Sequence, residues 1–171
     1  MITPKQRKWV ETLETTTKKQ GQRALHNIKD DAYCCLGICE SLFCDSESVY
    51  DKGSIRPLTR FHHGGTDCTF FLTDRTTEEL RFYDIYAKLN TPITYKGEEY
   101  SSLYKLNDDG VTFKEIAAII RSDPANVFIP DEEYEERVYL DWVNNFISVE
   151  AFAEHYDMTI EQANAFLESK Q

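Results

Sequence analysis

Residues 33–39 read YCCLGIC and place three cysteines around a glycine. From residue 35 onward, apolar side chains recur at i, i+1, i+4, i+7 and i+8, and this spacing predicts a helix with one core-facing stripe. We expect Asp30 or Asp31 to cap the N-terminus of this helix. Glycine inside a helix costs about 1 kcal/mol relative to alanine. Gly37 therefore indicates a close backbone neighbour or a bound group beside the helix.

The cysteines of this stretch allow two interpretations. A thiol at a helix N-terminus has its thiolate favoured by the helix dipole. Cys34 is then the candidate nucleophile, because Cys35 falls on the core-facing stripe, and His26, His62 or His63 is the candidate base of a Cys–His hydrolase. Alternatively, the cysteines are small hydrophobic side chains that pack the helix onto the core, and the protein is not an enzyme.

Local signals place further elements on both sides of this helix. Thr3 and Pro4 form an N-cap followed by proline at the first helical position, which predicts a helix ending near Lys18. Residues 44–66 are rich in polar and turn-forming side chains, so we expect an irregular segment. Residues 68–72 form a short apolar run that predicts a strand.

The following segment alternates helix and hairpin signals. We expect Thr73-Asp74 to cap a helix that continues to Lys88, and the Lys96-Gly97 pair predicts a hairpin turn. Thr112 and Glu115 form a capping box at the start of an apolar-faced helix, which Pro124 ends. Together these signals predict an α+β fold, helix-rich with a small sheet, for a domain of residues 1–129.

Composition limits the classes of protein to consider. A chain of 171 residues with 41% hydrophobic residues can bury a core without a disulfide or a metal. No apolar run approaches the ~20 residues of a membrane helix, and no apolar segment follows the basic N-terminus. The five cysteines contain no CxxC pair. We therefore expect a cytoplasmic protein with reduced thiols and no metal, cofactor or membrane partner.

Charge is distributed unevenly along the chain, whose formal net charge is −11. Residues 1–29 carry a net charge of +5, residues 30–130 a net charge of −7, and residues 131–171 a net charge of −9. The acidic balance argues against duplex nucleic acid as a partner. A local basic pocket for a small anion remains compatible with it.

Two basic segments are candidates for such a pocket. In the first, lysines and an arginine surround Gln20-Gly21, although they equally fit a solvated helix face. In the second, an arginine that can grip a phosphate precedes two histidines and two glycines, although a polar loop or a metal site would also explain the pattern. The candidate ligand-binding residues are Lys18, Lys19, Arg23, Arg60, His62 and His63.

Three motifs occur in order: Gln20-Gly21, YCCLG at residues 33–37, and LNDxGxxFxxIA at residues 106–117. Together they resemble a family of small accessory proteins encoded by tailed bacteriophages, over residues 5–125. The resemblance implies a phage protein acting in the host cytoplasm. By analogy with phage proteins that blunt host defence, we expect it to bind a small anionic, nucleotide-like ligand, such as a host-defence signal, as a homo-oligomer.

Residues 130–171 lie outside this resemblance and form a predicted acidic helical extension. Residues 149–167 are similar to a helix-turn-helix, with Thr159 capping the second helix. That helix carries Glu161 and Glu168, and the acidic charge opposes DNA binding. We expect a docking or dimerisation module, or a stabilising extension, so the alternative function is binding of a host protein through these helices.

Overall fold

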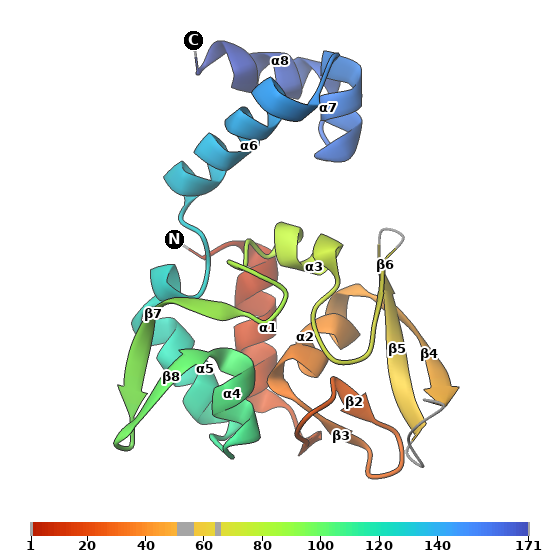
Figure 1. Cartoon of the computed structure of the whole chain (residues 1–171), viewed down its shortest axis with the longest axis vertical. Helices are drawn as coiled ribbons and strands as arrows, with labels where there is room; N and C mark the ends of the chain where they lie inside the picture. The colour runs from red at the N-terminus through yellow and green to blue at the C-terminus, as the bar shows by residue number, and fades with distance from the viewer. Residues whose placement is uncertain (1, 51–56, 64–65, 171) are drawn as a thin grey trace. The chain divides into compact units, whose positions relative to one another are not determined.

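The computed structural model describes residues 2–50, 57–63 and 66–170, and it divides into two compact units. The first unit, Met1–Ile129, combines helices with strands, whereas the described part of the second, Pro130–Gln171, is helical (Figure 1). The predicted α+β class is confirmed. Within the described residues, no helix is both long and apolar enough to cross a membrane.

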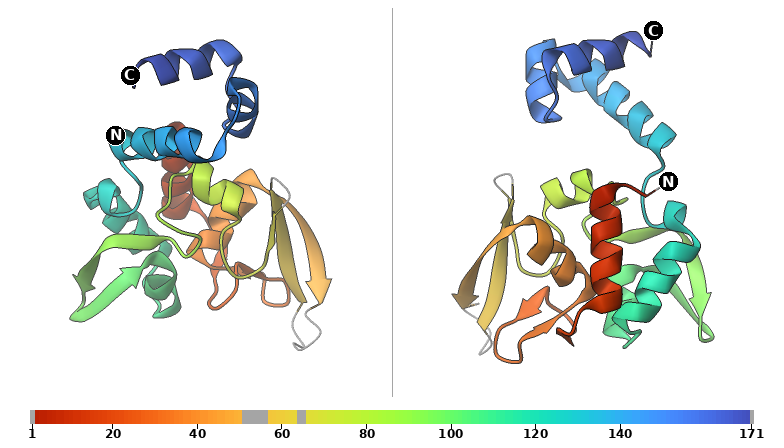
Figure 2. Two further views of the ribbon diagram at one scale, coloured as in Figure 1. Left: turned by 45° about the horizontal axis from the view of Figure 1, so that its top comes forward. Right: turned by 180° about the vertical axis from the view of Figure 1, so that it is seen from behind.

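Helix α1 is the centre of the first unit, with α5 packed along it (Figures 1 and 2). Thr3 caps α1 and proline opens it, as predicted, but the helix ends at Thr15 rather than near Lys18. Trp9 of α1 is fully buried and donates a hydrogen bond to the Cys35 carbonyl oxygen at 3.1 Å. The helices of this unit are α1 (Pro4–Thr15), α2 (Cys35–Phe43), α3 (Asp74–Glu79), α4 (Leu103–Asp108), α5 (Phe113–Ser122) and the 3-10 helix η1 (Pro124–Asn126).

Two sheets lie on opposite sides of α1 (Figures 1 and 2). The larger sheet has the strand order β1-β3-β2-β5-β4, with β6 also paired to β5, and only the β1–β3 pair is parallel. The smaller sheet is the hairpin β7–β8, whose predicted turn at Lys96-Gly97 is confirmed. The strands are β1 (Lys19–Gln20), β2 (His26–Asn27), β3 (Ala32–Tyr33), β4 (Asp45–Tyr50), β5 (Pro57–His63), β6 (Thr66–Cys68), β7 (Lys88–Tyr95) and β8 (Glu98–Ser102).

The structure corrects three predictions between residues 44 and 88. The segment expected to be irregular contains the antiparallel pair β4–β5. The strand expected at residues 68–72 is instead β6, which ends at Cys68. Thr73 does cap α3, but that helix ends at Glu79 and is followed by Arg81 in the left-handed region, at φ 58°.

Helix α2 begins later than predicted. Cys34, not an aspartate, is its N-cap, and the Cys34 sulfur accepts a hydrogen bond from the Gly37 N–H at 3.3 Å. Asp31 lies too far upstream, and its carboxylate contacts His26 instead. The close backbone neighbour predicted at Gly37 is confirmed, because a Cβ at this position would lie 1.7 Å from the Leu25 carbonyl oxygen.

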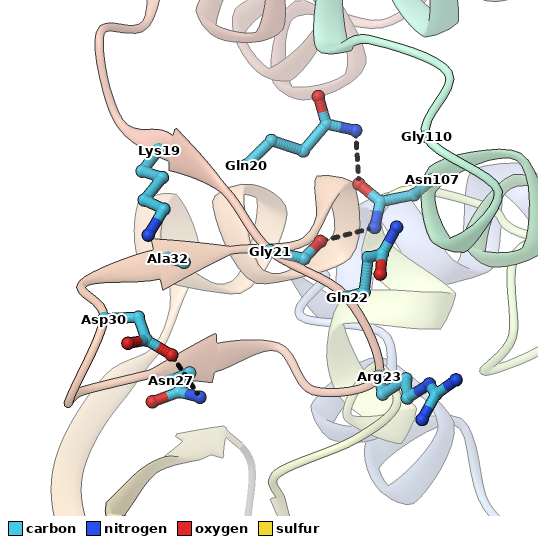
Figure 3. Close-up of a pocket in the computed structure, with 10 residues that line it drawn as sticks. All are labelled: Lys19, Gln20, Gly21, Gln22, Arg23, Asn27, Asp30, Ala32, Asn107 and Gly110. Carbon is cyan, nitrogen blue, oxygen red and sulfur yellow. Dashed lines mark hydrogen bonds between the residues drawn. The ribbon is translucent and has the colours of Figure 1, made fainter.

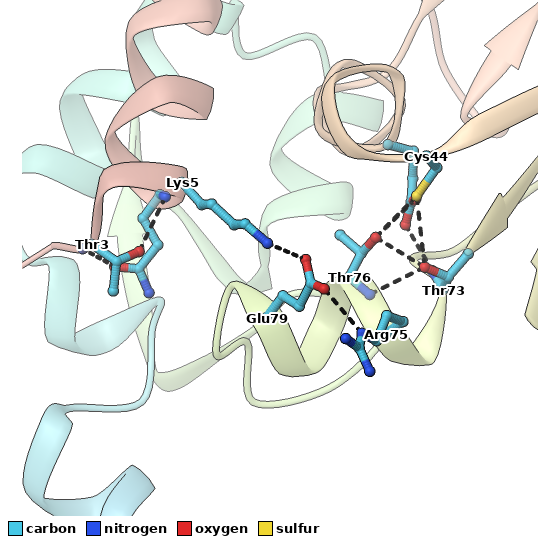
Figure 4. A network of polar contacts seen from close by, with 9 residues as sticks. Thr3, Lys5, Cys44, Thr73, Arg75, Thr76 and Glu79 are labelled. Atoms are coloured by element: carbon cyan, nitrogen blue, oxygen red, sulfur yellow. Dashed lines mark hydrogen bonds and ion pairs between the residues drawn. The ribbon is translucent and has the colours of Figure 1, made fainter. Parts of the chain in front are cut away.

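A buried polar network joins the end of α2 to the start of α3. Glu40 is fully buried and accepts hydrogen bonds from the Thr73 N–H at 2.7 Å, the Thr76 hydroxyl at 3.1 Å and the Cys44 thiol. Figure 4 shows the side chains of Cys44, Thr73 and Thr76 pointing toward one another. Burial, and then the hydrogen bond to Glu40, raise the pKa of Cys44 to about 12. This thiol therefore acts as a donor that fixes the α3 cap.

The second unit has a small core of its own, which includes Phe152, Ala153, Ala163 and Leu167. Thr159 caps the last helix with a capping box, as predicted. The three helices of this unit are α6 (Asp131–Asn145), α7 (Val149–His155) and α8 (Ile160–Glu168).

Candidate functional site

A polar hollow of about 630 Å³ opens beside β1 and β3 in the first unit (Figure 3). Its walls come from β1, the turn that follows it, the β2–β3 connection and the end of α4. We call it the polar hollow. Its lining residues are Lys19, Gln20, Gly21, Gln22, Arg23, Asn27, Asp30, Ala32, Asn107 and Gly110.

Asn107 holds the inner wall of the polar hollow together. This fully buried side chain accepts hydrogen bonds from the Gln20 side-chain amide at 3.1 Å and the Cys35 N–H at 3.0 Å. Its own amide donates to the Gly21 carbonyl oxygen at 2.8 Å. Figure 3 shows Gln20 and Gly21 converging on Asn107. One amide thereby ties β1 to α4 and to the N-terminus of α2.

Gln20 extends this network to the start of α5. Its side-chain amide donates to the Val111 carbonyl oxygen at 2.7 Å, and its side-chain oxygen accepts from the Phe113 N–H at 3.1 Å. Strand β1 has only two residues and therefore few backbone hydrogen bonds to its neighbour. The side-chain hydrogen bonds of Gln20 add to the stabilisation of this short strand. Gln20 therefore ties this wall to the start of α5.

Lys19 and Arg23 are the cations of the polar hollow, and they lie at separate ends of it (Figure 3). Within the described residues, neither side chain has a hydrogen bond or an ion pair. The lining contains one acidic side chain, Asp30, so its formal charge is +1 on a strongly acidic chain. The Arg23 backbone is in the left-handed region at φ 64°, where its N–H donates to Asp108 at 3.0 Å.

The other predicted ligand-binding residues do not line the polar hollow. Lys18 lies over the Tyr33 ring, with its nitrogen 3.8 Å from the ring centroid. Arg60 on β5 pairs with Glu47 on β4 at 3.2 Å, and His62 lies 3.6 Å from the same carboxylate. Cross-strand pairing in β4–β5 thus draws Arg60 and His62 to Glu47. The side chain of His63 lies outside the described part of the structure.

The backbone N–H groups at the N-terminus of α2 lower the pKa of Cys34, as predicted, but the net shift is in the opposite direction. Burial outweighs the hydrogen bond from Gly37 and raises the pKa of Cys34 to about 12. Burial likewise raises the pKa values of Cys35 and Cys39. In the part of the chain that is described, none of the hydrogen bonds of Cys34 involves a histidine. The burial of all three thiols agrees with the alternative interpretation, in which they pack the core.

His26 is a buried residue of β2. Its ring stacks on Tyr33 at 3.7 Å between centroids, and its nitrogens contact the Thr59 hydroxyl at 2.6 Å and Asp31 at 3.1 Å. Burial lowers the pKa of His26, opposed by the hydrogen bond and charge of Asp31 and assisted by the charge of Lys18. The folded protein therefore favours the neutral ring.

We expect the stability of the fold to decrease below neutral pH because of His26. Its folded-state pKa is below the ordinary value of 6.5, so the unfolded chain binds the proton first. The contribution is fully present above pH 6.5 and is lost as the pH falls through the folded-state pKa. Urea unfolding between about pH 5 and 8 should show this slope. His26→Gln should flatten it, and an unchanged slope in the variant would contradict the assignment.

The fold and the hollow define an α+β domain that carries a polar, net cationic recess beside its larger sheet. Residues 1–124 match the family described as Domain of unknown function (DUF8296), and the chain belongs to this family. Comparison with curated proteins and with solved structures gives no match. The polar hollow and all the residues that line it fall within the matched span.

Lys19 and Arg23 were predictable from the sequence as cations of a pocket, but the role of Asn107 was not. The three motifs that carry the phage resemblance contribute Gln20, Cys35 and Asn107, which meet at one point in the structure. The separation of 87 residues between Gln20 and Asn107 gives no periodic pattern from which their contact could be inferred. The sequence held one indication of this role, which is that Asn107 directly follows the apolar Leu106. The structure shows that Asn107 is buried.

Proposed function

We propose that this protein binds a small anionic, nucleotide-like ligand in the polar hollow. The observation that carries the proposal is a pair of cations, Lys19 and Arg23, whose side chains have no hydrogen bond or ion pair within the described residues. The rest of the recess is lined by amide side chains, small residues and one carboxylate, Asp30. Arginine and lysine form charge-assisted hydrogen bonds with phosphate, which are about twice as strong as neutral ones. Their positions at separate ends suit an elongated anion rather than a single small ion (Figure 3).

The dimensions and the amides of the polar hollow support the same class of ligand. A volume of about 630 Å³ falls within the range of roughly 300–1,000 Å³ that is typical of small-molecule sites. Gln22 is exposed at the rim and Asn27 is half-buried in the wall, and both offer donors and acceptors to a sugar or a phosphate. These groups would fix orientation, while the cations supply attraction.

We propose further that binding occurs without turnover. The raised pKa of Cys34 leaves the thiol protonated near neutral pH, which removes the nucleophile that a Cys–His hydrolase needs. Sequestration of a ligand requires only affinity. The resemblance to phage accessory proteins makes a nucleotide signal of host defence the ligand we favour.

Thermal unfolding with a panel of nucleoside phosphates, cyclic dinucleotides and ADP-ribose tests the proposal. A ligand at 100 times its Kd adds about 2.7 kcal/mol to the free energy of unfolding and should raise Tm by several degrees. The double variant Lys19→Gln/Arg23→Gln should lose this shift, because the loss of each cation should raise Kd at least tenfold.

The matched control is Arg60→Gln, which removes an arginine that pairs with Glu47 and lies outside the hollow's lining. This control should keep the full ligand-induced shift. The proposed site would be contradicted if no ligand of the panel raised the Tm of the wild-type protein. It would also be contradicted if the double variant and the control lost the same part of the ligand-induced Tm shift.

A further inference from the structure

A second, smaller hollow adjoins the polar one. Its volume is about 280 Å³, and we call it the aromatic hollow. Arg23 lines both hollows, so a single residue joins them. The other main lining residues of the aromatic hollow are Cys34, Phe70, Phe71, Tyr104 and Asp108.

Three residues that line the aromatic hollow, Phe70, Phe71 and Tyr104, are exposed rings, and Tyr86, outside the lining, contacts both Phe71 and Tyr104. Among the described residues of the first unit, the exposed large apolar side chains are Phe70, Phe71, Tyr86 and Tyr104. Phe71 lies 4.4 Å from Tyr86 and 6.4 Å from Phe70, and Tyr86 lies 6.2 Å from Tyr104, between ring centroids. Exposed apolar side chains scattered singly need no explanation, but a contiguous group of them marks a binding surface.

We propose that the aromatic hollow receives the base of a nucleotide whose phosphates occupy the polar hollow, an inference that rests on the proposed function. The ligand is thereby a nucleoside phosphate rather than a sugar phosphate or an inorganic anion. Every nucleobase has a π-face, so any base can stack on an aromatic side chain, whichever hydrogen-bond donors and acceptors the base carries. Tyr104 and Phe71 are the rings that we assign to stacking.

The size of the aromatic hollow and its position support a base as the occupant. A space of about 280 Å³ lies at the low end for small-molecule sites and fits one ring system. The buried Cys34 lines it with a protonated thiol, which is neutral and weakly polar. Arg23, at the junction, can contact the phosphates or the base, because guanidinium groups bind both phosphate and aromatic faces.

Binding calorimetry with ADP, GDP, CDP, UDP and inorganic pyrophosphate tests the base subsite. The wild-type protein should bind at least one diphosphate nucleotide about tenfold or more tightly than pyrophosphate, because base stacking on an aromatic ring contributes on this order. Tyr104→Ala should remove most of that difference and leave pyrophosphate affinity unchanged. Tyr104→Phe keeps the ring and should bind as the wild-type protein does.

The outcomes separate this inference from the proposed function. Equal affinity of the wild-type protein for pyrophosphate and for every nucleotide would overturn the base subsite and leave the anion site standing. Full nucleotide affinity in Tyr104→Ala, with its Tm near the wild-type value, would also overturn the base subsite. The exposed rings would then be better explained as a contact surface for a protein partner. Failure of pyrophosphate, the four nucleoside diphosphates and every ligand of the thermal-unfolding panel to bind the wild-type protein would overturn both.

Discussion

Replacing Gly37 by alanine should destabilise the fold by roughly 3 kcal/mol or more, because the new Cβ has no space. It would lie 1.7 Å from the carbonyl oxygen of Leu25 and 2.4 Å from its carbonyl carbon. These atoms belong to backbone that is itself fixed, since the Leu25 carbonyl oxygen accepts the Cys34 N–H at 3.1 Å. Relief therefore requires α2 to move away from residue 25, which breaks the Cys34 cap and the packing behind it.

Urea unfolding followed by circular dichroism measures this effect. The matched control is Gly97→Ala in the β7–β8 turn, where a Cβ meets no atom within 4 Å but φ is +90°. That control should cost only the conformational strain of the left-handed region, about 1–2 kcal/mol. Equal losses in the two variants would mean that α2 can shift freely, and the close approach would then not limit this position.

Asn107→Ala should destabilise the fold by roughly 2–5 kcal/mol and should weaken ligand binding. The substitution leaves the buried Cys35 N–H and the part-buried Gly21 carbonyl oxygen without their partner, and an unsatisfied buried group costs about 1–3 kcal/mol. It also frees Gln20 from one of its anchors. Because β1 depends on these hydrogen bonds, the wall that carries Lys19 should lose its fixed position.

The matched control for Asn107 is Gln22→Ala. Gln22 lines the same hollow but is exposed, and substitutions at exposed positions usually change stability by no more than about 0.5 kcal/mol. Urea midpoints should separate the two variants clearly. An Asn107→Ala protein as stable as the control would show that water replaces the amide, and the proposed role of Asn107 in holding the hollow would be wrong.

Local chemistry made several elements predictable from the sequence. The helix starts at Thr3, Thr112 and Thr159 were predictable because each cap needs only a residue and its partner three positions later. The turn at Lys96-Gly97 was predictable for the same reason, since the turn residues themselves specify it. These signals depend on a few adjacent residues and survive in any tertiary context.

The β4–β5 pair and the composition of the site were not predictable in this way. The described β4 residues begin with the polar run 45–48, so alternation of apolar side chains gives no strand signal there, and the pairing to β5 is what defines the strand. Arg60 resembled a ligand-binding residue because Glu47, its partner, is 13 positions away in sequence. The sequence shows which side chains have charge, but only the fold shows which charges are already neutralised.

The left-handed backbone at Arg23 bears on how freely this position can change. A non-glycine residue at φ 64° costs about 1–2 kcal/mol relative to glycine, so stability alone would favour glycine or asparagine there. An arginine at a strained position between two hollows, whose guanidinium has no hydrogen bond or ion pair within the described residues, is a poor choice for folding. Under the proposed function, residue 23 is a place where selection for a ligand opposes selection for a stable fold, so drift toward glycine would mark relatives that have lost the ligand.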